Sequence, residues 1–224
     1  MKNNYNRKNN LPYVTGKIAV SKNNLIYSKL NKKITNKHSN KFTHLLRYKN
    51  DALMVTYKTL NNDNSKLNCR IKGFSNFSPK RIILDNKLQT KINTYVINTA
   101  NKNNTLIFYN QADKSKVIDF KKKKIQLIKS KVNKQGKFDV KAILKKLYKY
   151  NCRNLLIEGG DCLTSHLLKN RIFNKFYLYK SPKNLSKETE YLKFNSLDVL
   201  KKNYKNKFNL NLFLGKDKIT LYKN

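Results

Sequence analysis

The segment that most constrains this chain is a short apolar strand that leads through an acidic residue and two glycines into an amphipathic helix. It spans residues 154–169 and reads NLLIEGGDCLTSHLLK. Gly159 and Gly160 allow a sharp turn and a close approach of ligand to backbone, and the N-terminus of the following helix suits a phosphate. Glu158 could accept hydrogen bonds from an amino or imino group of the same ligand. An ordinary strand-to-helix turn with a solvated Glu158 accounts for the local pattern equally well.

The remaining chain alternates short apolar runs with helical patterns. We expect a polar loop at 59–70 and helices that begin near Ser39 (a possible N-cap), at Asp139 (an N-cap) and after Gly160. Strands are expected at 12–20, 52–56, 81–85, 94–98, 105–109, 125–128, 155–157, 175–179, 208–214 and 219–222. This order predicts an α/β fold with a mostly parallel central sheet flanked by helices and a C-terminal antiparallel hairpin. We expect a disordered leader at 1–11 and a single domain over 12–224.

Cysteine usage and hydropathy predict a cytoplasmic protein. Cys69, Cys152 and Cys162 form no C-x-x-C pair, and the histidines are equally isolated, so no disulfide framework or metal site is expected. The sequence contains no apolar run of roughly 20 residues that could span a membrane. The polar start, MKNNYNRKNN, does not resemble a secretory signal.

A net charge of +38 invites a nucleic-acid interpretation, which we weigh against a compositional one. Only 6 of the 50 basic residues are arginine, and the lysines are spread along the whole chain among many asparagines. Nucleic-acid binders more often concentrate charge on one face and use arginine for bidentate contacts. A dedicated nucleic-acid partner is therefore not expected, although a basic RNA-binding module remains the alternative from another functional class. The positive potential would still attract small anionic substrates.

Three collinear segments carry a family resemblance: LPYVTGKIAVS, HLLRYKNDALMVTYKTLNNDNSKLNCR and LLIEGGDCLTSHLL…KFYLYKSPK. The patterns R-x-x-x-D-A-x-x-V and T-x-x-x-D-(x)3-L-x-x-R, together with the E-G-G strand end, are more specific in combination than alone. In these segments the chain resembles the C-terminal reductase domain of RibD, the bacterial riboflavin-biosynthesis reductase, over roughly residues 12–183. The resemblance implies a dihydrofolate-reductase-like fold.

The resemblance also implies a reaction and its participants. The ribosyl ring of 5-amino-6-(5-phosphoribosylamino)uracil is opened and reduced to the ribityl chain by NADPH. The zinc ligands H-x-E and P-C-x-x-C of a deaminase are absent from this sequence, so deamination is expected from another chain. The family further implies a homodimer. Two enzymatic alternatives stay open, namely a reductase that acts on the undeaminated 2,5-diamino-pyrimidinone and a related reductase with another pterin or pyrimidine substrate.

The family positions assign roles residue by residue. The catalytic candidates are Lys17, near the reacting ribose, and Asp63. The implied substrate contacts are Asn31, Arg47, Leu67, Arg70 and Glu158. The implied NADPH contacts are Ala19, Lys33, Thr59, Asp63, Asn86, Gly160, Asp161, Cys162, Leu163, Thr164, Ser165 and His166. Without the family pattern, Arg47 could simply cap its helix and Asp63 could be an ordinary turn residue.

Three departures from the family pattern bear on the cofactor. Asn23-Asn24 replaces an Asp-Gly pair, and Asn31 and Lys33 occupy the positions of a Ser-x-Trp pair. Asn31 can still hydrogen-bond a phosphate and Lys33 can pair with one, but Lys33 cannot stack as Trp does. Asp161 places an acid beside the expected pyrophosphate, which is unfavourable unless it caps a helix. These positions put cofactor affinity in question more than substrate identity.

Overall fold

The computed structural model describes residues 2–31, 33–212 and 214–224. The chain divides into two compact units, the first formed by residues 1–13 and 47–155 and the second by residues 14–46 and 156–224. The helix α2 (Lys37–Tyr48) and the strand β7 (Asn154–Ile157) each continue from one unit into the other. The expectation of a single reductase domain over 12–224 stays a prediction.

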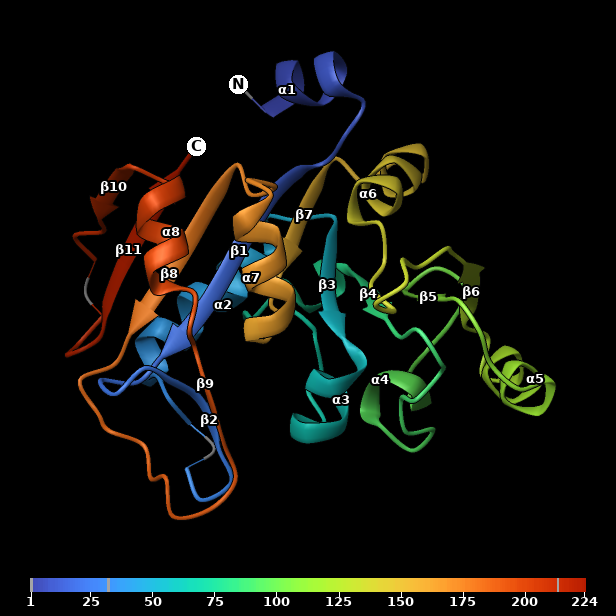
Figure 1. The fold of residues 1–224 in the computed structure, drawn as a ribbon, viewed down its shortest axis with the longest axis horizontal. Helices are drawn as coiled ribbons and strands as arrows, with labels where there is room; N and C mark the ends of the chain where they lie inside the picture. The colour runs from blue at the N-terminus through green and yellow to red at the C-terminus, as the bar shows by residue number, and fades with distance from the viewer. Residues whose placement is uncertain (1, 32, 213) are drawn as a thin grey trace. The chain divides into compact units, whose positions relative to one another are not determined.

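The first unit contains a parallel sheet built from consecutive strands. β3 (Ala52–Thr56) pairs with β4 (Lys80–Leu84), β4 with β5 (Thr105–Tyr109), and β5 with β6 (Gln126–Lys129), and every pairing is parallel (Figure 1). β3, β4 and β5 are buried along most of their length, as expected for parallel strands covered on both faces. The carboxyl ends of these strands therefore share one edge, where ligands of parallel sheets bind.

The helices of the first unit are α3 (Tyr57–Asp63), α4 (Tyr95–Asn98), α5 (Lys114–Lys122) and α6 (Val140–Lys149), with a 3₁₀ turn at Ser75–Phe77. α6 confirms its sequence signals. The Asp139 carboxylate accepts a hydrogen bond from the Ala142 N–H at 3.1 Å and so caps the helix. Val140, Ile143, Leu144 and Leu147 form its buried face.

Two local predictions for the first unit were wrong. The expected loop at 59–70 begins inside α3, which ends where Asn64 takes a left-handed conformation at φ 44°. The strand expected at 94–98 is the short helix α4, with Val96 and Ile97 both buried instead of alternating. The Asn64 Oδ1 atom accepts from the Tyr95 N–H at 2.8 Å and so satisfies a donor at the start of α4.

The leader that we expected to be disordered contains the helix α1 (Lys2–Asn9). The Asn6 side chain is buried and donates to the carbonyl oxygens of Leu11 and Arg153 at 2.8 and 2.9 Å. These contacts tie α1 to the segment before β7. Composition alone missed them because both acceptors are backbone carbonyls.

The second unit contains a mixed set of strands. β1 (Tyr13–Val20) pairs in parallel with β8 (Lys175–Lys180), β11 (Lys218–Lys223) pairs antiparallel with β8, and β10 (Asn206–Asn209) pairs antiparallel with β11. The predicted closing hairpin is thus confirmed with a shorter first strand, and Phe213 of the expected range lies outside the described residues. Together with the first unit, this confirms the predicted α/β class with a mostly parallel sheet and a C-terminal antiparallel edge.

A small antiparallel pair, β2 (Leu25–Ser28) with β9 (Tyr191–Lys193), and the helices α7 (Asp161–Lys169) and α8 (Leu197–Asn203) complete the second unit. Gly16 in β1 lies where no side chain fits, because a Cβ atom there would overlap Cδ2 of Phe176 and would lie 2.6 Å from Cε1 of Phe173. The helices of the described residues include none long and apolar enough to cross a bilayer.

The start of α2 differs from the sequence prediction. The N-cap function expected of Ser39 belongs to Asn36, whose Oδ1 accepts from the Ser39 N–H at 3.0 Å. The buried carboxylate of Asp217 accepts from the Asn36 N–H at 2.8 Å and from the Ser39 hydroxyl at 2.7 Å. An acid from the turn before β11 therefore lies at the helix N-terminus, where negative charge is stabilising.

Candidate functional site

Two predicted substrate residues of the first unit, Arg47 and Arg70, contact the same asparagine. Arg47 is buried in the last turn of α2 and donates from Nη1 to the Asn68 carbonyl oxygen at 3.2 Å. Arg70 is exposed and donates from Nη1 to the Asn68 Oδ1 atom at 2.9 Å. The structure thus brings two guanidinium groups to one loop residue, and guanidinium forks suit phosphate oxygens.

The loop that carries these contacts is fixed by buried neighbours. Leu67 is 1% exposed and has φ 51°, a left-handed conformation that is costly for a branched side chain. The Cys69 side chain is buried, and its N–H donates to the Ser78 hydroxyl at 3.0 Å. The side chain of Leu67 lies in the core of the first unit, and its predicted contact with substrate stays a prediction.

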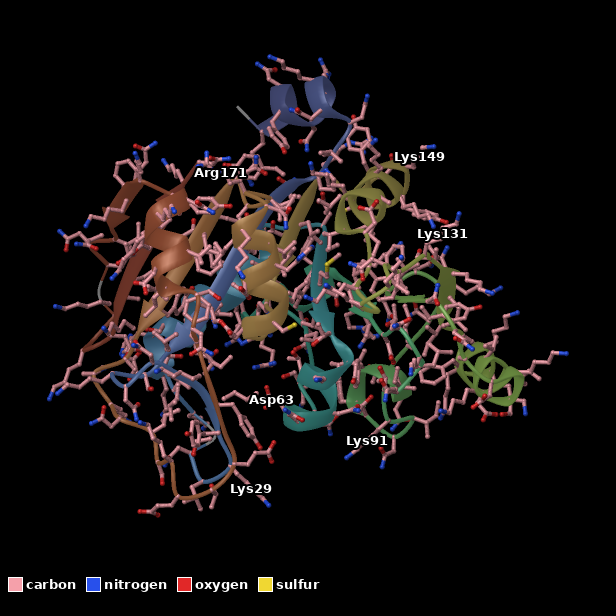
Figure 2. All side chains as sticks on the ribbon, viewed as in Figure 1. Lys29, Asp63, Lys91, Lys131, Lys149 and Arg171 are labelled. Atoms are coloured by element: carbon pink, nitrogen blue, oxygen red, sulfur yellow. The ribbon has the colours of Figure 1, made fainter. Side chains whose placement is uncertain are left out.

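The helix α3 presents Thr59 and Asp63 directly after the carboxyl end of β3. Asn61, two residues before the end of α3, joins this helix to the loop before α4. Its side chain donates to the Gln89 carbonyl and accepts from the Lys91 N–H, both at 2.9 Å. Figure 2 labels Asp63 and Lys91 in this region. The Asp63 side chain is exposed, but the protein atoms packed around its carboxylate displace part of the surrounding water. This desolvation raises the pKa of Asp63.

Asp85 and Asn86 follow β4 at the same edge. The Asp85 carboxylate is fully buried and accepts from the N–H groups of Gln89 and Thr90 and from the Thr90 hydroxyl, at 2.7 to 2.8 Å. Asn86, a predicted cofactor contact, donates from Nδ2 to the Gly136 carbonyl at 3.1 Å. Its Oδ1 atom is buried and has no hydrogen-bond partner among the described residues. Such an orphaned acceptor is costly unless a ligand or water donates to it.

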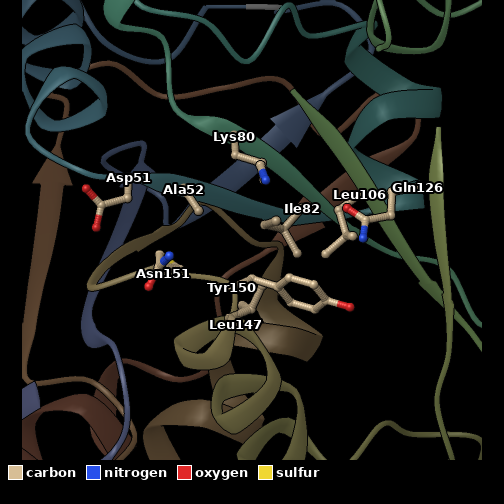
Figure 3. Close-up of a pocket in the computed structure, with 10 residues that line it drawn as sticks. Asp51, Ala52, Lys80, Ile82, Leu106, Gln126, Leu147, Tyr150 and Asn151 are labelled. Atoms are coloured by element: carbon tan, nitrogen blue, oxygen red, sulfur yellow. The ribbon is translucent and has the colours of Figure 1, made fainter. Parts of the chain in front are cut away.

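Two cavities lie at opposite edges of the sheet in the first unit. One, of about 310 Å³, lies at the carboxyl ends of β5 and β6 beside α5 and is lined by Tyr109, Asn110, Gln111, Ala112, Lys114, Val117, Ile118 and Lys129. The other, of about 190 Å³, lies at the amino ends of β3 and β4 between the sheet and the end of α6 (Figure 3). Cys152 lines the second cavity, and burial raises its pKa to about 12, so its thiol is unreactive. The carboxyl-end cavity shares its edge with Asn86.

In the second unit, β1 presents the predicted residues Lys17 and Ala19 on one face. Both are partly exposed, whereas Gly16, Ile18 and Val20 are buried. The Lys17 Nζ atom lies 4.8 Å from the centroid of the Tyr179 ring on β8, a cation–π geometry. This contact fixes the direction of the lysine side chain along the strand face.

The turn after β7 has the form that the sequence predicted. Gly160 is the N-cap of α7 with φ −71° and ψ 177°, and within residues 2–31, 33–212 and 214–224 no side chain caps this helix end. A Cβ atom added to Gly160 would meet no atom of the described residues within 4 Å, whereas one added to Gly159 would lie 3.0 Å from Cδ2 of Leu163. Gly159 is therefore required for close packing, and Gly160 leaves space at a helix N-terminus, where anions bind. Partly exposed Glu158 leads into this turn.

The side chain of Asp161 does not act at its own helix end. Its Oδ1 accepts from the Asn195 N–H at 3.0 Å and from the Ser196 hydroxyl at 2.8 Å, and Ser196 is the N-cap residue of α8. The acid that looked unfavourable beside a pyrophosphate is thus compensated at the start of another helix. Of the other predicted cofactor residues in this segment, Cys162 is exposed, Thr164 is buried and donates to the Gly159 carbonyl, and Leu163, Ser165 and His166 are partly exposed.

The other departures also have local explanations. Asn24 has φ 61°, so it adopts the left-handed conformation that glycine usually supplies in a turn, and Asn23 donates to the Leu185 carbonyl at 2.9 Å. Asn31 accepts from the Ser186 N–H at 2.8 Å through its Oδ1. Lys33 is exposed.

Sequence reasoning missed Asn68 and the Asn195–Ser196 pair. Asn68 lies between two residues of the L-x-x-R pattern, so its position was visible, but its contacts to two arginines were not. Ser196 and Asn195 lie outside every motif that we identified. Among the described residues there is also no group of three or more His, Cys, Asp or Glu side chains that could hold a metal ion.

Comparisons of this chain with known proteins agree on one family. A family model described as the RibD C-terminal domain matches residues 16–207. The riboflavin biosynthesis protein RibD of Aquifex aeolicus (strain VF5) is 29% identical over 174 residues, which cover 77% of this chain and 47% of that protein. The 2,5-diamino-6-ribosylamino-4(3H)-pyrimidinone 5′-phosphate reductase of Archaeoglobus fulgidus is 24% identical over 182 residues, 76% of this chain and 80% of that protein.

The fold comparison agrees. The structure of Acinetobacter baumannii RibD matches with a TM-score of 0.78 and 17% sequence identity over 98% of this chain and 59% of that one. The chain spans about half the length of the RibD relatives that it matches.

Proposed function

Because this chain belongs to the RibD C-terminal domain family of riboflavin-biosynthesis pyrimidine reductases, we propose that it reduces the ribosyl group of 5-amino-6-(5-phosphoribosylamino)uracil to the ribityl chain with NADPH. The observation that carries the proposal is the convergence of Arg47 and Arg70 on Asn68. Two guanidinium groups held at one loop residue suit the 5-phosphate of such a substrate. A relative from Buchnera aphidicola whose name is 5-amino-6-(5-phosphoribosylamino)uracil reductase supports the deaminated ring as the substrate.

The residues of the predicted NADPH contacts fit a dinucleotide in three respects. In the second unit, the N-terminus of α7 has open space at Gly160, and the Asp161 carboxylate is held by hydrogen bonds from Asn195 and Ser196. In the first unit, a buried Asn86 oxygen lacks a partner among the described residues. We assign the pyrophosphate to the segment 160–166 and the remaining contacts to Ala19, Lys33, Thr59, Asp63 and Asn86. When bound, the cofactor supplies the hydride.

The reduction needs a hydride at C1 of the open-chain imine and a proton at the adjacent nitrogen. Lys17 is the proposed proton donor, and its position over the Tyr179 ring holds the ammonium on one face of β1. Asp63, whose pKa is raised by desolvation from the protein packed around its carboxylate, is the second proposed catalytic group. Glu158 is assigned to the pyrimidine ring, and Asn31, with its Oδ1 bonded to Ser186, keeps an Nδ2 group that suits a phosphate oxygen.

The partners follow from the same assignment. The deaminated substrate requires a deaminase, which we assign to another chain, and we propose a cytoplasmic homodimer. Neither a membrane nor a nucleic acid is part of the proposal. A second candidate function, reduction of the undeaminated 2,5-diamino-6-ribosylamino-pyrimidinone phosphate, is favoured by the archaeal relative, whose named activity is of this kind.

The decisive experiment follows NADPH absorbance with the purified protein and each of the two ring forms, with and without the 5-phosphate. Wild type should oxidise NADPH with the phosphorylated uracil form, and Arg70→Ala and Glu158→Ala should each lose most of the rate. Turnover of the undeaminated ring alone would move the step earlier in the pathway. Salt-sensitive RNA binding without NADPH binding would favour the basic RNA-binding alternative instead.

A further inference from the structure

Asn68 connects the two guanidinium groups that the proposed function assigns to phosphate. Its backbone carbonyl accepts from Arg47 at 3.2 Å and its side-chain Oδ1 accepts from Arg70 at 2.9 Å. We propose that Asn68 is a positioning residue that sets the spacing of Arg47 and Arg70 for a phosphate monoester. This inference rests on the proposed function for the identity of the substrate, and it adds a residue that the family pattern did not assign.

Asn68 is suited to this role because its backbone cannot shift easily. Leu67 before it is 1% exposed, and Cys69 after it is fully buried, with the Cys69 N–H bonded to Ser78. The partly exposed Asn68 side chain lies between these two buried anchors. A bond from such a residue restrains the exposed Arg70, which would otherwise lose more rotamer entropy on binding an anion.

The chemistry of an amide also matters at this position. Asn68 accepts from Arg70 through a neutral oxygen, so the local positive charge is preserved for an incoming phosphate. A carboxylate of the same shape would also accept from Arg70, but it would offset the charge and repel the phosphate. Alanine would remove the contact to Arg70 and would keep the backbone contact to Arg47. These two substitutions therefore separate hydrogen bonding from charge.

The test measures binding of ribose 5-phosphate by calorimetry, and KM and kcat for the phosphorylated and dephosphorylated substrates. Asn68→Ala should raise the Kd for ribose 5-phosphate roughly five- to tenfold, as expected for the net loss of one solvent-accessible hydrogen bond. Asn68→Asp should raise it further. KM for the phosphorylated substrate should rise by a similar factor while kcat is preserved, and the dephosphorylated substrate should show no difference. The matched control is Asn98→Ala, an exposed asparagine of the same unit on α4.

Several outcomes would overturn the inference. A Kd for ribose 5-phosphate that is unchanged in Asn68→Ala would do so, as would tighter phosphate binding in Asn68→Asp or an equal loss with the dephosphorylated substrate. Failure of the proposed function is seen separately, because wild type would then oxidise no NADPH with either ring. In that case the ribose 5-phosphate titration still decides whether Asn68 positions the arginines for a phosphate, and absence of binding by wild type would refute both.

Discussion

Replacing Gly160 by alanine tests whether this glycine is needed for the stability of the fold or for the binding of a ligand. Its φ of −71° is accessible to alanine, and in the part of the chain that the structure describes no atom lies within 4 Å of the new methyl group. Alanine is a poorer N-cap than glycine by about 0.5–1 kcal/mol, while the reduced freedom of the unfolded chain returns about 0.4–1 kcal/mol. We therefore expect the free energy of unfolding to change by less than about 0.5 kcal/mol.

The same methyl group should interfere with an anion at the N-terminus of α7, because it occupies the space through which a pyrophosphate would approach the backbone N–H groups. We expect the Kd for NADPH, measured by nicotinamide fluorescence, to rise at least tenfold, equivalent to about 1.4 kcal/mol. Urea unfolding of the same sample provides the stability measurement. Unchanged NADPH affinity would refute the assignment of this helix end to the cofactor, and a loss of stability above about 2 kcal/mol would refute the steric reasoning.

Three further predictions follow from single residues. Gly16→Ala should lower the free energy of unfolding by about 3 kcal/mol or more, because its Cβ would overlap Phe176; an unchanged urea midpoint would contradict this. A thiol reagent should label exposed Cys162 in the native protein but not buried Cys152, and NADPH should slow the labelling of Cys162, as mass spectrometry of the peptides would show. Desolvation raises the pKa of the Asp63 carboxyl group above 3.8, so the folded state binds a proton at this group more tightly than the unfolded state does. The free energy of unfolding therefore declines as the pH rises from 3.8 through the raised pKa. Asp63→Asn should therefore be more stable than wild type near neutral pH and lose this advantage in acid, while its reductase rate falls; equal stability at all pH values would count against desolvation of this carboxylate.

The sequence predicted the elements whose signal is local and missed those that depend on distant partners. The apolar run 52–56 and the capped helix after Asp139 were both confirmed. The segment 94–98 looked like a strand because it holds adjacent β-branched residues, yet an asparagine from the end of α3 starts a helix there. Ser39 looked like an N-cap, but Asn36 is closer to the true start of α2.

The candidate site shows the same division. The E-G-G turn could be predicted because two adjacent glycines indicate a sharp turn with little side-chain bulk, and the geometry of the turn agrees with this prediction. The hydrogen bonds of the Asp161 carboxylate could not be predicted, since its partners lie more than 30 positions away in the chain. Leu67 is a different case, because a position that the family pattern assigns to substrate contact holds a buried side chain, and that contact stays a prediction.

The acid at the start of α2 has a consequence for the order in which the protein is made. Asp217 is synthesised 181 residues after Asn36, whose N–H it binds. The N-terminal part of a chain leaves the ribosome first. The helix α2, which carries Arg47 in its last turn, therefore emerges long before the carboxylate that completes its first turn. Substitutions or insertions near Asp217 should consequently change how early this helix becomes resistant to proteolysis, even though they leave the sequence of the helix untouched.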